Sequence, residues 1–383
     1  MDSILHALTG QRPEMLKMLR QLVECESPST DKAAVDRFGR IVAAILRKMG
    51  AEVRAIPSPK TGNHLRAEFR FAENQRARQI LLLGHIDTVW EMGTLARMPF
   101  RIDRGRAYGP GVFDMKGGIV IALFALRSLR QMGIPLKRNV SLLLNADEEI
   151  GSTASRPITE LEARKSDYVL VVEPPYGLHG AVKTARRGVG EFVLTVHGRA
   201  AHAGIEPQKG ASSISEICNQ IVNMEYVANK SKYSTLHVGT IHGGTRTNVI
   251  PAEAVAHIDV RAARVADQMR VEKQLCSLRP VDPRTKLTVT GGFSRPPMER
   301  TRQVAALFDR ARRLAKPLGI DLQETAVGGG SDGNFTAALG VPTLDGLGAV
   351  GDGAHAVHEH IVVRELPRRA ALLAHLIASL GSE

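Results

Sequence analysis

The chain has 383 residues, of which 43% are hydrophobic and 23% charged, and its formal net charge is +12. This length allows two domains with separate cores, and the composition is that of an ordinary globular protein. Aromatic residues make up only 4%, so the stacking platforms of single-strand binders are lacking and we expect no nucleic-acid partner. We attribute the basic excess to a solvated surface, with steering of an anionic substrate as the functional alternative.

Cysteine usage and the N-terminus indicate a cytoplasmic location. Cys25, Cys218 and Cys276 are scattered without CxxC spacing, which argues against a disulfide framework and fits a reducing compartment. The N-terminus has no basic region followed by an apolar core, so no secretory signal is expected. No apolar run approaches the roughly 20 residues that a spanning helix needs, and we expect no membrane partner.

Helical and strand patterns alternate over the first half of the chain. Apolar stripes at helical spacing predict two helices within residues 12–49, and a mostly apolar helix is expected over residues 119–132. Residues 91–108 are predicted to form a loop rich in Gly, Arg and Pro. Strands are predicted at residues 51–56, 65–71, 79–85, 139–145 and 168–172. This alternation predicts an α/β sheet.

Three of these strands end in imidazole or carboxylate side chains. The first ends at His85 and Asp87, the second runs into Glu148 and Glu149, and the third into Glu173. A histidine satisfied by a neighbouring aspartate, or a solvated acidic turn, would explain each one alone. Because α/β sheets place their chemistry at the carboxyl ends of strands, the recurrence favours a shared functional site.

The composition changes near residue 186, where a β-α-β-β-α-β order begins. Its elements are predicted at residues 190–197, 211–227, 235–242, 252–261, 267–278 and 286–290. This is the order of a ferredoxin-like module, and it would be inserted because helices at residues 302–316 and 365–380 resume the first pattern. The predicted domains are a catalytic domain over residues 1–185 and 297–383, and an inserted domain over residues 186–296.

The candidate site residues offer imidazole and carboxylate ligands without thiolate. His85, Asp114, Glu149, Glu173 and one late histidine form a donor set that suits zinc, and also cobalt or manganese. One carboxylate shared between two ions holds them roughly 3.5–4 Å apart, which clamps attacking and leaving oxygens. Since Glu148 and Glu149 are adjacent, one can ligate while the other acts as general base toward water.

Five motifs in this order resemble the M20 family of zinc aminoacyl hydrolases, nearest to the glutamate carboxypeptidase type. The resemblance covers nearly the whole chain. It implies a zinc-hydrolase catalytic domain, with a mixed sheet flanked by helices, and an inserted ferredoxin-like lid through which two copies form a homodimer. The motifs are Gly-His85-Ile-Asp87-Thr, Gly-Pro-Gly-Val-Phe-Asp114-Met-Lys-Gly-Gly, Asp-Glu148-Glu149-Ile-Gly-Ser, Val-Glu173-Pro and Gly-Ala-His355.

Carried over residue by residue, the resemblance implies two zinc ions per subunit. His85, Asp114 and Glu173 would hold one zinc ion. Glu149 and His355 would hold the second, together with the bridging Asp114.

The resemblance also implies that Asp87 orients His85 and that Glu148 is the general base. One departure concerns the last ligand, which the family commonly follows with Ser-Pro-x-Glu. Here His355 is followed by Ala-Val-His358-Glu-His, so His358 competes with His355 for the role.

Substrate-binding residues are implied in the inserted domain and in one glycine-rich loop. His202 resembles the lid histidine that polarises the scissile carbonyl, often from the partner subunit. Asn248 and Arg261 resemble carboxylate-binding positions, although Arg261 fits a salt-bridged strand residue almost as well. Gly329 and Ser331 lie in a stretch that resembles the loop over the substrate, with a tight turn as the alternative.

These residues predict a metal-dependent hydrolase that cleaves an amide or peptide bond next to a free carboxylate. Its substrate would be a small peptide or an N-acyl amino acid. The runner-up activity is an N-acyl-amino-acid deacylase of the deacetylase or desuccinylase type, which shares the metal chemistry.

Two further classes are less favoured. A non-catalytic binding protein of the same fold would be expected to lack Glu148 or a ligand, and none is missing. A Cys–His hydrolase is disfavoured because Cys25 and Cys218 lie on apolar helical stripes and are expected in the core.

Overall fold

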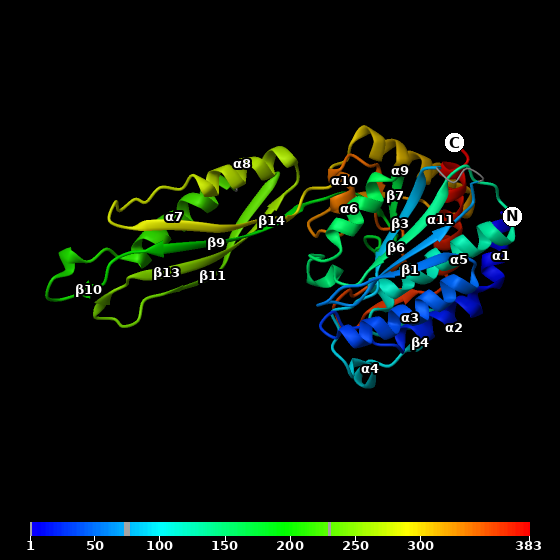
Figure 1. Cartoon of the computed structure of the whole chain (residues 1–383), viewed down its shortest axis with the longest axis horizontal. Helices are drawn as coiled ribbons and strands as arrows, with labels where there is room; N and C mark the ends of the chain where they lie inside the picture. Colours follow the sequence, from blue (N-terminus) through cyan, green and yellow to red (C-terminus); the bar gives the residue numbers. More distant parts are fainter. Residues whose placement is uncertain (1, 73–76, 229–230) are drawn as a thin grey trace. The chain divides into compact units, whose positions relative to one another are not determined.

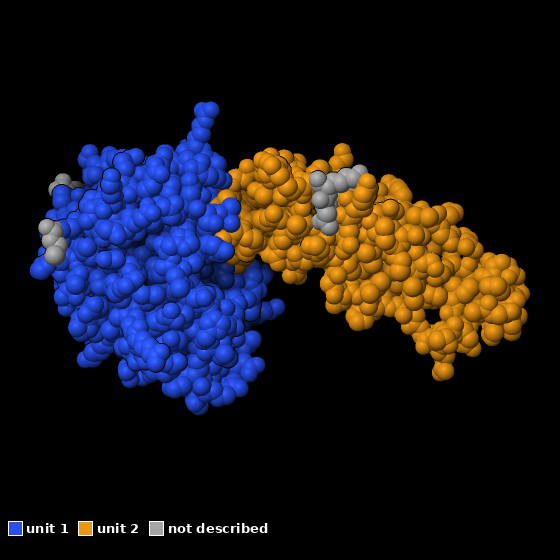
Figure 2. Space-filling model, turned by 180° about the vertical axis from the view of Figure 1, so that it is seen from behind, with its two compact units in different colours: residues 1–184, 300–326, 331–383 blue, residues 185–299, 327–330 orange. Residues whose placement is uncertain are grey.

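The computed structural model describes residues 2–72, 77–228 and 231–383 of the chain (Figure 1). These residues form two compact units, coloured separately in Figure 2. Unit 1 comprises residues 1–184, 300–326 and 331–383, and unit 2 comprises residues 185–299 and 327–330. Unit 2 therefore interrupts the sequence of unit 1.

Unit 1 is built around a six-stranded mixed sheet. The strands, in spatial order, are β1 (Glu52–Ile56), β2 (His64–Phe69), β6 (Asn139–Asn145), β3 (Gln79–His85), β7 (Ser166–Val171) and β16 (Thr343–Leu344). The last four are mutually parallel, whereas β1 and β2 are antiparallel to their neighbours. The predicted α/β class is thereby confirmed. The parallel order brings the carboxyl ends of β3, β6 and β7 to one edge.

Helices cover both faces of this sheet, which is why its central strands are continuous apolar runs. In β3, Ile80 and Leu82 belong to the main core, whereas Leu81 and Leu83 belong to a smaller core on the other face. Figure 1 shows α2, α3 and α5 on one side of the sheet and α6 and α10 on the other. The helices of unit 1 are α1 (Ser3–Gly10), α2 (Arg12–Val23), α3 (Lys32–Lys48), α4 (Thr94–Arg97), α5 (Gly117–Gln131), α6 (Arg156–Arg164), α9 (Arg302–Ala315), α10 (Gly333–Ala338) and α11 (Glu365–Gly381).

A second, four-stranded antiparallel sheet in unit 1 corrects the sequence prediction. Residues 101–108 were expected to be loop, but they form the hairpin β4 (Arg101–Asp103) and β5 (Arg106–Tyr108). The hairpin pairs with β18 (His360–Val362), which pairs with β17 (Gly351–Asp352). The strand β4 has only three residues and all of them are exposed, so there is no buried face from which its sequence could predict a strand.

Unit 2 has the predicted ferredoxin-like order. Its elements are β9 (Gly188–His197), α7 (Ser213–Ala228), β11 (Ser234–Gly243), β13 (Glu253–Ala262), α8 (Val265–Cys276) and β14 (Lys286–Arg295). The four strands form one antiparallel sheet in the order β11-β13-β9-β14. Phe192, Leu194 and Val196 alternate with polar or exposed positions along β9 and form the core together with Ile217 and Met224 of α7. A short pair, β10 (Ala201–His202) and β12 (Val249–Ile250), is formed by the loops at one end of this sheet.

The cysteines are all free thiols, and one of them is not where the sequence predicted it. Cys25 is half-buried against the main core, as expected. Cys218, expected in the core of unit 2, is exposed. It follows Ile217 by one position, and a turn of about 100° moves it off the face of α7 that covers the sheet. Among the described residues, no helix combines the length and the apolar character needed to cross a bilayer.

Arg369 of α11 fixes a loop beneath the candidate site. Its side chain is buried, and its guanidinium donates hydrogen bonds to the carbonyl oxygens of Gly180, Gly346 and Gly348. Burial lowers the pKa of Arg369 to about 10. The backbone N–H of Gly348 in turn donates to the carbonyl oxygen of Glu173 at 2.9 Å. The buried arginine therefore supports the segment that delivers Glu173.

Candidate active site

Strand ends and two loops of unit 1 bring together the side chains that the sequence singled out. His85 is the last residue of β3, and Glu173 follows β7. Glu148 and Glu149 begin a short 3-10 turn (Glu148–Ile150) after β6. Asp114 comes from an irregular helical turn before α5, where its backbone leaves helical geometry and the peptide bond to residue 115 is cis.

The carboxylate of Asp114 lies between two histidines. Its Oδ1 is 3.3 Å from Nε2 of His85, and its Oδ2 is 3.5 Å from Nε2 of His355. The imidazole of His85 also lies 3.4 Å from Oε1 of Glu173, whereas that of His355 lies 3.3 Å from Oε2 of Glu149. The five side chains thus form two half-sites, each with one imidazole and one terminal carboxylate, that share Asp114.

The ring of His85 is oriented by Asp87. Nδ1 of His85 lies 3.0 Å from the backbone carbonyl oxygen of Asp87 and 3.5 Å from its carboxylate. An imidazole whose Nδ1–H donates to a carbonyl directs the lone pair of Nε2 in the opposite direction, as a metal-ligating histidine requires. His85 is almost fully buried, so this orientation is fixed by its surroundings.

The carboxylate of Asp87 also binds the backbone of the neighbouring turn, which begins at Glu148. Its oxygens accept hydrogen bonds from the hydroxyl of Ser29 at 2.7 Å and from the backbone N–H groups of Glu148 and Glu149 at 3.3 and 3.2 Å. Asp87 is buried, so each of these donors stabilises its charge. One carboxylate therefore fixes both the imidazole of His85 and the start of the Glu148 turn.

Ionisation of these groups is strongly coupled. Burial disfavours the charged form of His85, but hydrogen bonds to Asp114, Asp87 and Glu173 outweigh it and raise its pKa well above the ordinary value. Hydrogen bonds to Asp114 and Glu149 raise the pKa of His355 to about 10. For Asp114, burial raises the pKa, yet the two imidazoles prevail and lower it below its usual range. The imidazoles of His85 and His355 therefore pair as cations with the carboxylates that surround them.

These side chains are better explained as ligands of divalent metal ions than as partners in ion pairs with one another. Oε1 of Glu149 is buried and has no hydrogen-bond partner among the described residues, although burial already raises the pKa of this carboxyl. The ligand atoms of His85, Asp114 and Glu149 lie within 4.8 Å of one another, as do those of His85, Glu148 and Glu173. Buried carboxylates facing imidazole nitrogens, without thiolate, suit zinc and other borderline or hard divalent ions.

Of the two late histidines, His355 lies at the site. It has a positive φ of 62°, in the loop between β17 and β18, and its side chain is half exposed. His358 is exposed, and across the described chain its ring forms no ion pair with a carboxylate. The geometry favours His355 as the last ligand, and the assignment stays a prediction.

Glu359 is a residue that the sequence reasoning missed. It is fully buried, and its carboxylate accepts hydrogen bonds from the backbone N–H groups of Gly111, Phe113 and Asp114 at 2.8–3.0 Å and from Nε1 of Trp90 at 2.7 Å. Burial raises its pKa to about 7 although these donors oppose the shift. The signal was present, because Glu359 keeps the spacing of the glutamate in the Ser-Pro-x-Glu frame.

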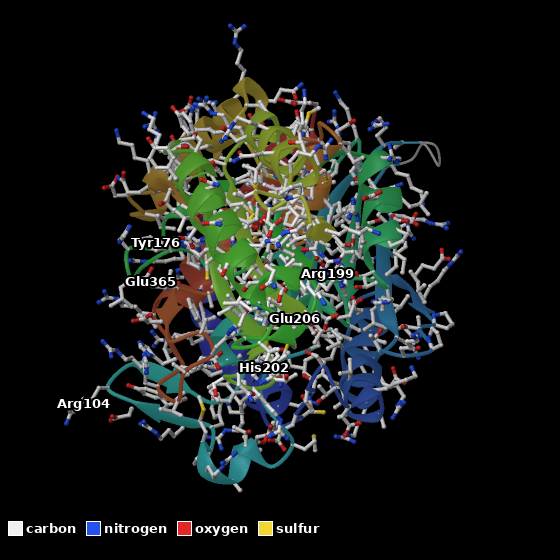
Figure 3. The ribbon with its side chains drawn as sticks, turned by 90° about the vertical axis from the view of Figure 1, so that its left-hand side faces the viewer. Arg104, Tyr176, Arg199, His202, Glu206 and Glu365 are labelled. Carbon is white, nitrogen blue, oxygen red and sulfur yellow. The ribbon has the colours of Figure 1, made fainter. Side chains whose placement is uncertain are left out.

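Two of the predicted substrate-binding residues lie together in unit 2. His202 pairs with Val249 across β10 and β12, and the backbone N–H of Ala203 donates to the carbonyl oxygen of Asn248 at 3.0 Å. Nδ1 of His202 accepts the backbone N–H groups of Gly204 and Ile205, both at 3.1 Å. In the neutral ring the hydrogen is therefore on Nε2, where the side chain is exposed (Figure 3).

The other three predicted substrate-binding residues make contacts within their own units. Arg261 forks onto Asp259 through Nε and Nη2, at 2.9 and 2.7 Å, as its alternative interpretation expected. The carbonyl oxygen of Gly329 accepts a hydrogen bond from Arg186 at 3.1 Å. Ser331 is buried, and its hydroxyl donates to Asp345 at 2.6 Å, which fits a structural turn. Their binding roles stay predictions.

Comparison with known proteins identifies relatives of the whole chain. Residues 81–379 match the family described as Peptidase family M20/M25/M40. Carboxypeptidase G2 of Pseudomonas sp. (strain RS-16) is 30% identical over 390 residues, which covers 100% of this chain and 93% of that protein. A Peptidase M20 domain-containing protein of Schizosaccharomyces pombe is 28% identical over 263 residues, covering 67% of this chain and 62% of that protein.

Solved structures share the fold at lower identity. A tripeptidase from Staphylococcus aureus superposes with a TM-score of 0.77 at 20% identity, covering 97% of this chain and 98% of the other. The M20 family metallo-carboxypeptidase Sso-CP2 from Sulfolobus solfataricus gives a TM-score of 0.67 at 16% identity, over 95% and 98% of the two chains. With the family match and the full-length relative, the assignment follows: the chain belongs to peptidase family M20/M25/M40 and is a hydrolase of that family.

Proposed function

We propose that the chain is a two-zinc hydrolase that cleaves an amide or peptide bond next to a free carboxylate, as a carboxypeptidase does. One observation carries the proposal, namely that Asp114 presents one oxygen to each of two imidazole–carboxylate half-sites. The 30% identity to a protein named Carboxypeptidase G2 over the full chain supports the carboxypeptidase assignment. The substrate would be a small peptide or an N-acyl amino acid.

In this proposal His85 and Glu173 would hold one ion, Glu149 and His355 would hold the other, and Asp114 would serve both. Bound ions supply a Lewis acid that polarises the scissile carbonyl and lowers the pKa of an attacking water to about 7. The remaining chemistry belongs to the side chains of the chain itself.

Glu148 is the group placed to move the proton. Its carboxylate is near enough to His85 and Glu173 to share a cluster with them, and its backbone is held by Asp87. We infer that Glu148 accepts the proton of the water as the water oxygen adds to the carbonyl carbon. The same carboxyl then donates that proton to the leaving nitrogen as the C–N bond breaks.

His202 and Arg261 have the hydrogen-bond donors that substrate binding needs. Because Nδ1 of His202 accepts two backbone N–H groups, its Nε2–H is available to stabilise the negative oxygen that develops on the carbonyl. Arg261 uses Nε and Nη2 for Asp259, and its Nη1 donates to no described residue. We propose that this Nη1, together with Asn248, recognises the free carboxylate of the substrate.

A substrate panel with a chelation control tests the proposed function. N-acyl-glutamates, dipeptides, and N-acetyl and N-succinyl amino acids are incubated with the protein and added zinc or cobalt, and amine release is measured. We expect release from the peptides and N-acyl-glutamates and its loss after exhaustive chelation, with recovery on adding metal. Activity that survives chelation would refute metal dependence, and release from N-acetyl or N-succinyl amino acids alone would favour the deacylase.

The variant Glu148→Gln tests the general base on the best substrate of that panel. We expect turnover to fall by about 10²- to 10⁴-fold because the amide cannot accept the proton. The metal content should stay that of the unmodified protein, since the side chain keeps its size. Glu160→Gln, at a partly exposed glutamate of α6 that pairs with Arg156 away from the cluster around Asp114, serves as the matched control and should keep full turnover. A near-native rate in Glu148→Gln would remove the assignment.

Metal analysis of two alanine variants decides the last ligand. After dialysis against metal-free buffer, His355→Ala should lose roughly one of the two ions, because its half-site keeps only carboxylates. His358→Ala should keep both, since its ring is exposed and faces no carboxylate of the described chain. The reverse pattern would transfer the role to His358.

We also propose that two copies associate through unit 2. Strand β11 lies at an edge of the sheet of unit 2, and within the described residues β13 is the one strand with which it pairs. Beside this edge, the side chains of Val222 and Tyr226 on α7 and Ile241 on β11 are exposed. An open strand edge flanked by apolar side chains is suited to pairing with a second copy about a two-fold axis.

A mass measurement in solution tests this association. The protein should have about twice the mass of the 41.5-kDa chain. Tyr226→Glu should shift it toward the monomer, because a carboxylate would be buried without a partner. Met269→Glu, at an exposed apolar residue of α8, is the control and should leave the mass unchanged. A protein that runs as a monomer would contradict the proposal.

A further inference from the structure

Unit 1 contains a cavity of about 590 Å³ that contributes nothing to the candidate active site. It lies where the β4–β5 turn, the start of α2, the end of β18 and the start of α11 meet. None of its residues belongs to the cluster around Asp114. Its lining is Arg12, Leu16, Arg104, Gly105, Arg106, Leu178, Val362, Val363, Arg364 and Glu365, and we call it the arginine cavity. Figure 3 labels Arg104 and Glu365.

The arginine cavity is strongly basic, and acidic side chains neutralise little of its positive charge. Four arginines line it against one carboxylate, that of Glu365, which pairs with Arg364 at 3.1 Å. The guanidinium groups of Arg12, Arg104 and Arg106 are exposed and have neither a hydrogen bond nor an ion pair with any residue that the structure describes. Like charges gathered around one hollow repel one another, and an anion bound between them would relieve that repulsion.

The shape and chemistry of the lining point to a small anion. The volume falls within the range of small-molecule sites, roughly 300–1,000 Å³. Several guanidinium groups around one cavity suit phosphate as a ligand. Each phosphate group offers three oxygens and carries more negative charge than a carboxylate. The side chains of Leu16, Leu178 and Val362 add an apolar wall, which suits a ligand with an organic part.

The cavity lies at the outer end of the segments that support the active site. Strands β5 and β18 pair through three residues, with Arg106 opposite Val362 at the cavity end. At the other end Tyr108 lies opposite His360, which directly follows Glu359. A ligand that fixes Arg106 would therefore hold the strand pair next to the carboxylate that accepts the backbone N–H of Asp114.

We propose that the arginine cavity binds a small phosphate anion that carries at least two phosphoryl groups, separately from the hydrolytic site. Two sources share this chemistry, inorganic pyrophosphate and a nucleoside diphosphate. The proposal does not depend on which substrate the hydrolytic site cleaves.

Isothermal titration of the metal-loaded protein at about 0.15 M salt tests the proposal, because nonspecific attraction is largely screened there. The probes are pyrophosphate and adenosine diphosphate. We expect saturable binding with one site per chain for at least one probe. The tighter probe identifies the source. The variant with Arg12→Gln and Arg106→Gln should weaken this binding by roughly tenfold or more, since each substitution removes a charged donor.

A charge-matched variant is the control. Arg37→Gln with Arg40→Gln removes two exposed arginines of α3 that lie outside the cavity, so binding should be unchanged. Equal loss in the two double variants would overturn the proposal, because binding would then follow net charge alone. If the variant with Arg12→Gln and Arg106→Gln still binds the probes with unchanged affinity, the probes bind at the metal site. This result would also overturn the proposal. A single-stranded oligonucleotide that binds more tightly than both probes would favour a macromolecular partner instead.

Discussion

The candidate site depends on one buried carboxylate, that of Asp114, shared between two imidazoles. His85 and His355 come from segments 270 residues apart, and Asp114 is the group that each of them approaches. Its position is set by the carboxylate of Glu359, which accepts the backbone N–H groups of Gly111, Phe113 and Asp114 itself. Leaving such buried donors without an acceptor costs about 1–3 kcal/mol each, so Glu359 stabilises the turn that presents Asp114. The shared carboxylate therefore depends on a second, fully buried carboxylate, that of Glu359.

Asp87 connects the imidazole of His85 with the turn that carries Glu148 and Glu149. It orients the ring of His85 through its carbonyl and receives the backbone of Glu148 and Glu149 on its carboxylate. A change at Asp87 would consequently disturb the ring of His85 and the backbone of Glu148 and Glu149 at once. This arrangement explains the spacing of His85 and Asp87, which lie two residues apart where β3 ends. The same spacing in the sequence indicates a functional site. The role is broader than the ring orientation that the sequence predicts.

Sequence reasoning was most reliable where burial leaves a periodic pattern. The runs of β3 and β6 are apolar because both sheet faces are covered, and they predicted the strands that end at His85 and before Glu148. It failed at β4, where every residue is exposed and pairing depends on β5. It also missed Glu359, although this residue keeps the spacing of the glutamate in the Ser-Pro-x-Glu frame, because its partners are mainly backbone N–H groups. The sequence motifs around Arg261 and Ser331 could be recognised, but the contacts of these residues with Asp259 and Asp345 are known only from the structure.

Charge separation within the chain bears on how it meets an acidic substrate. The chain as a whole carries +12, yet its candidate site gathers Asp87, Asp114, Glu148, Glu149 and Glu173 in one place. Without cations, such a cluster repels a free carboxylate, and the imidazoles only partly offset it. Two divalent ions would bring four positive charges to these five carboxylates and remove most of the local negative charge, so that the loaded site would no longer oppose the attraction of an anion by the basic surface. The acidic side chains repel a carboxylate when no cation is bound, and the ions that they would hold would offset this repulsion. If the proposed function holds, the attraction of a carboxylate substrate and the binding of metal depend on the same few side chains.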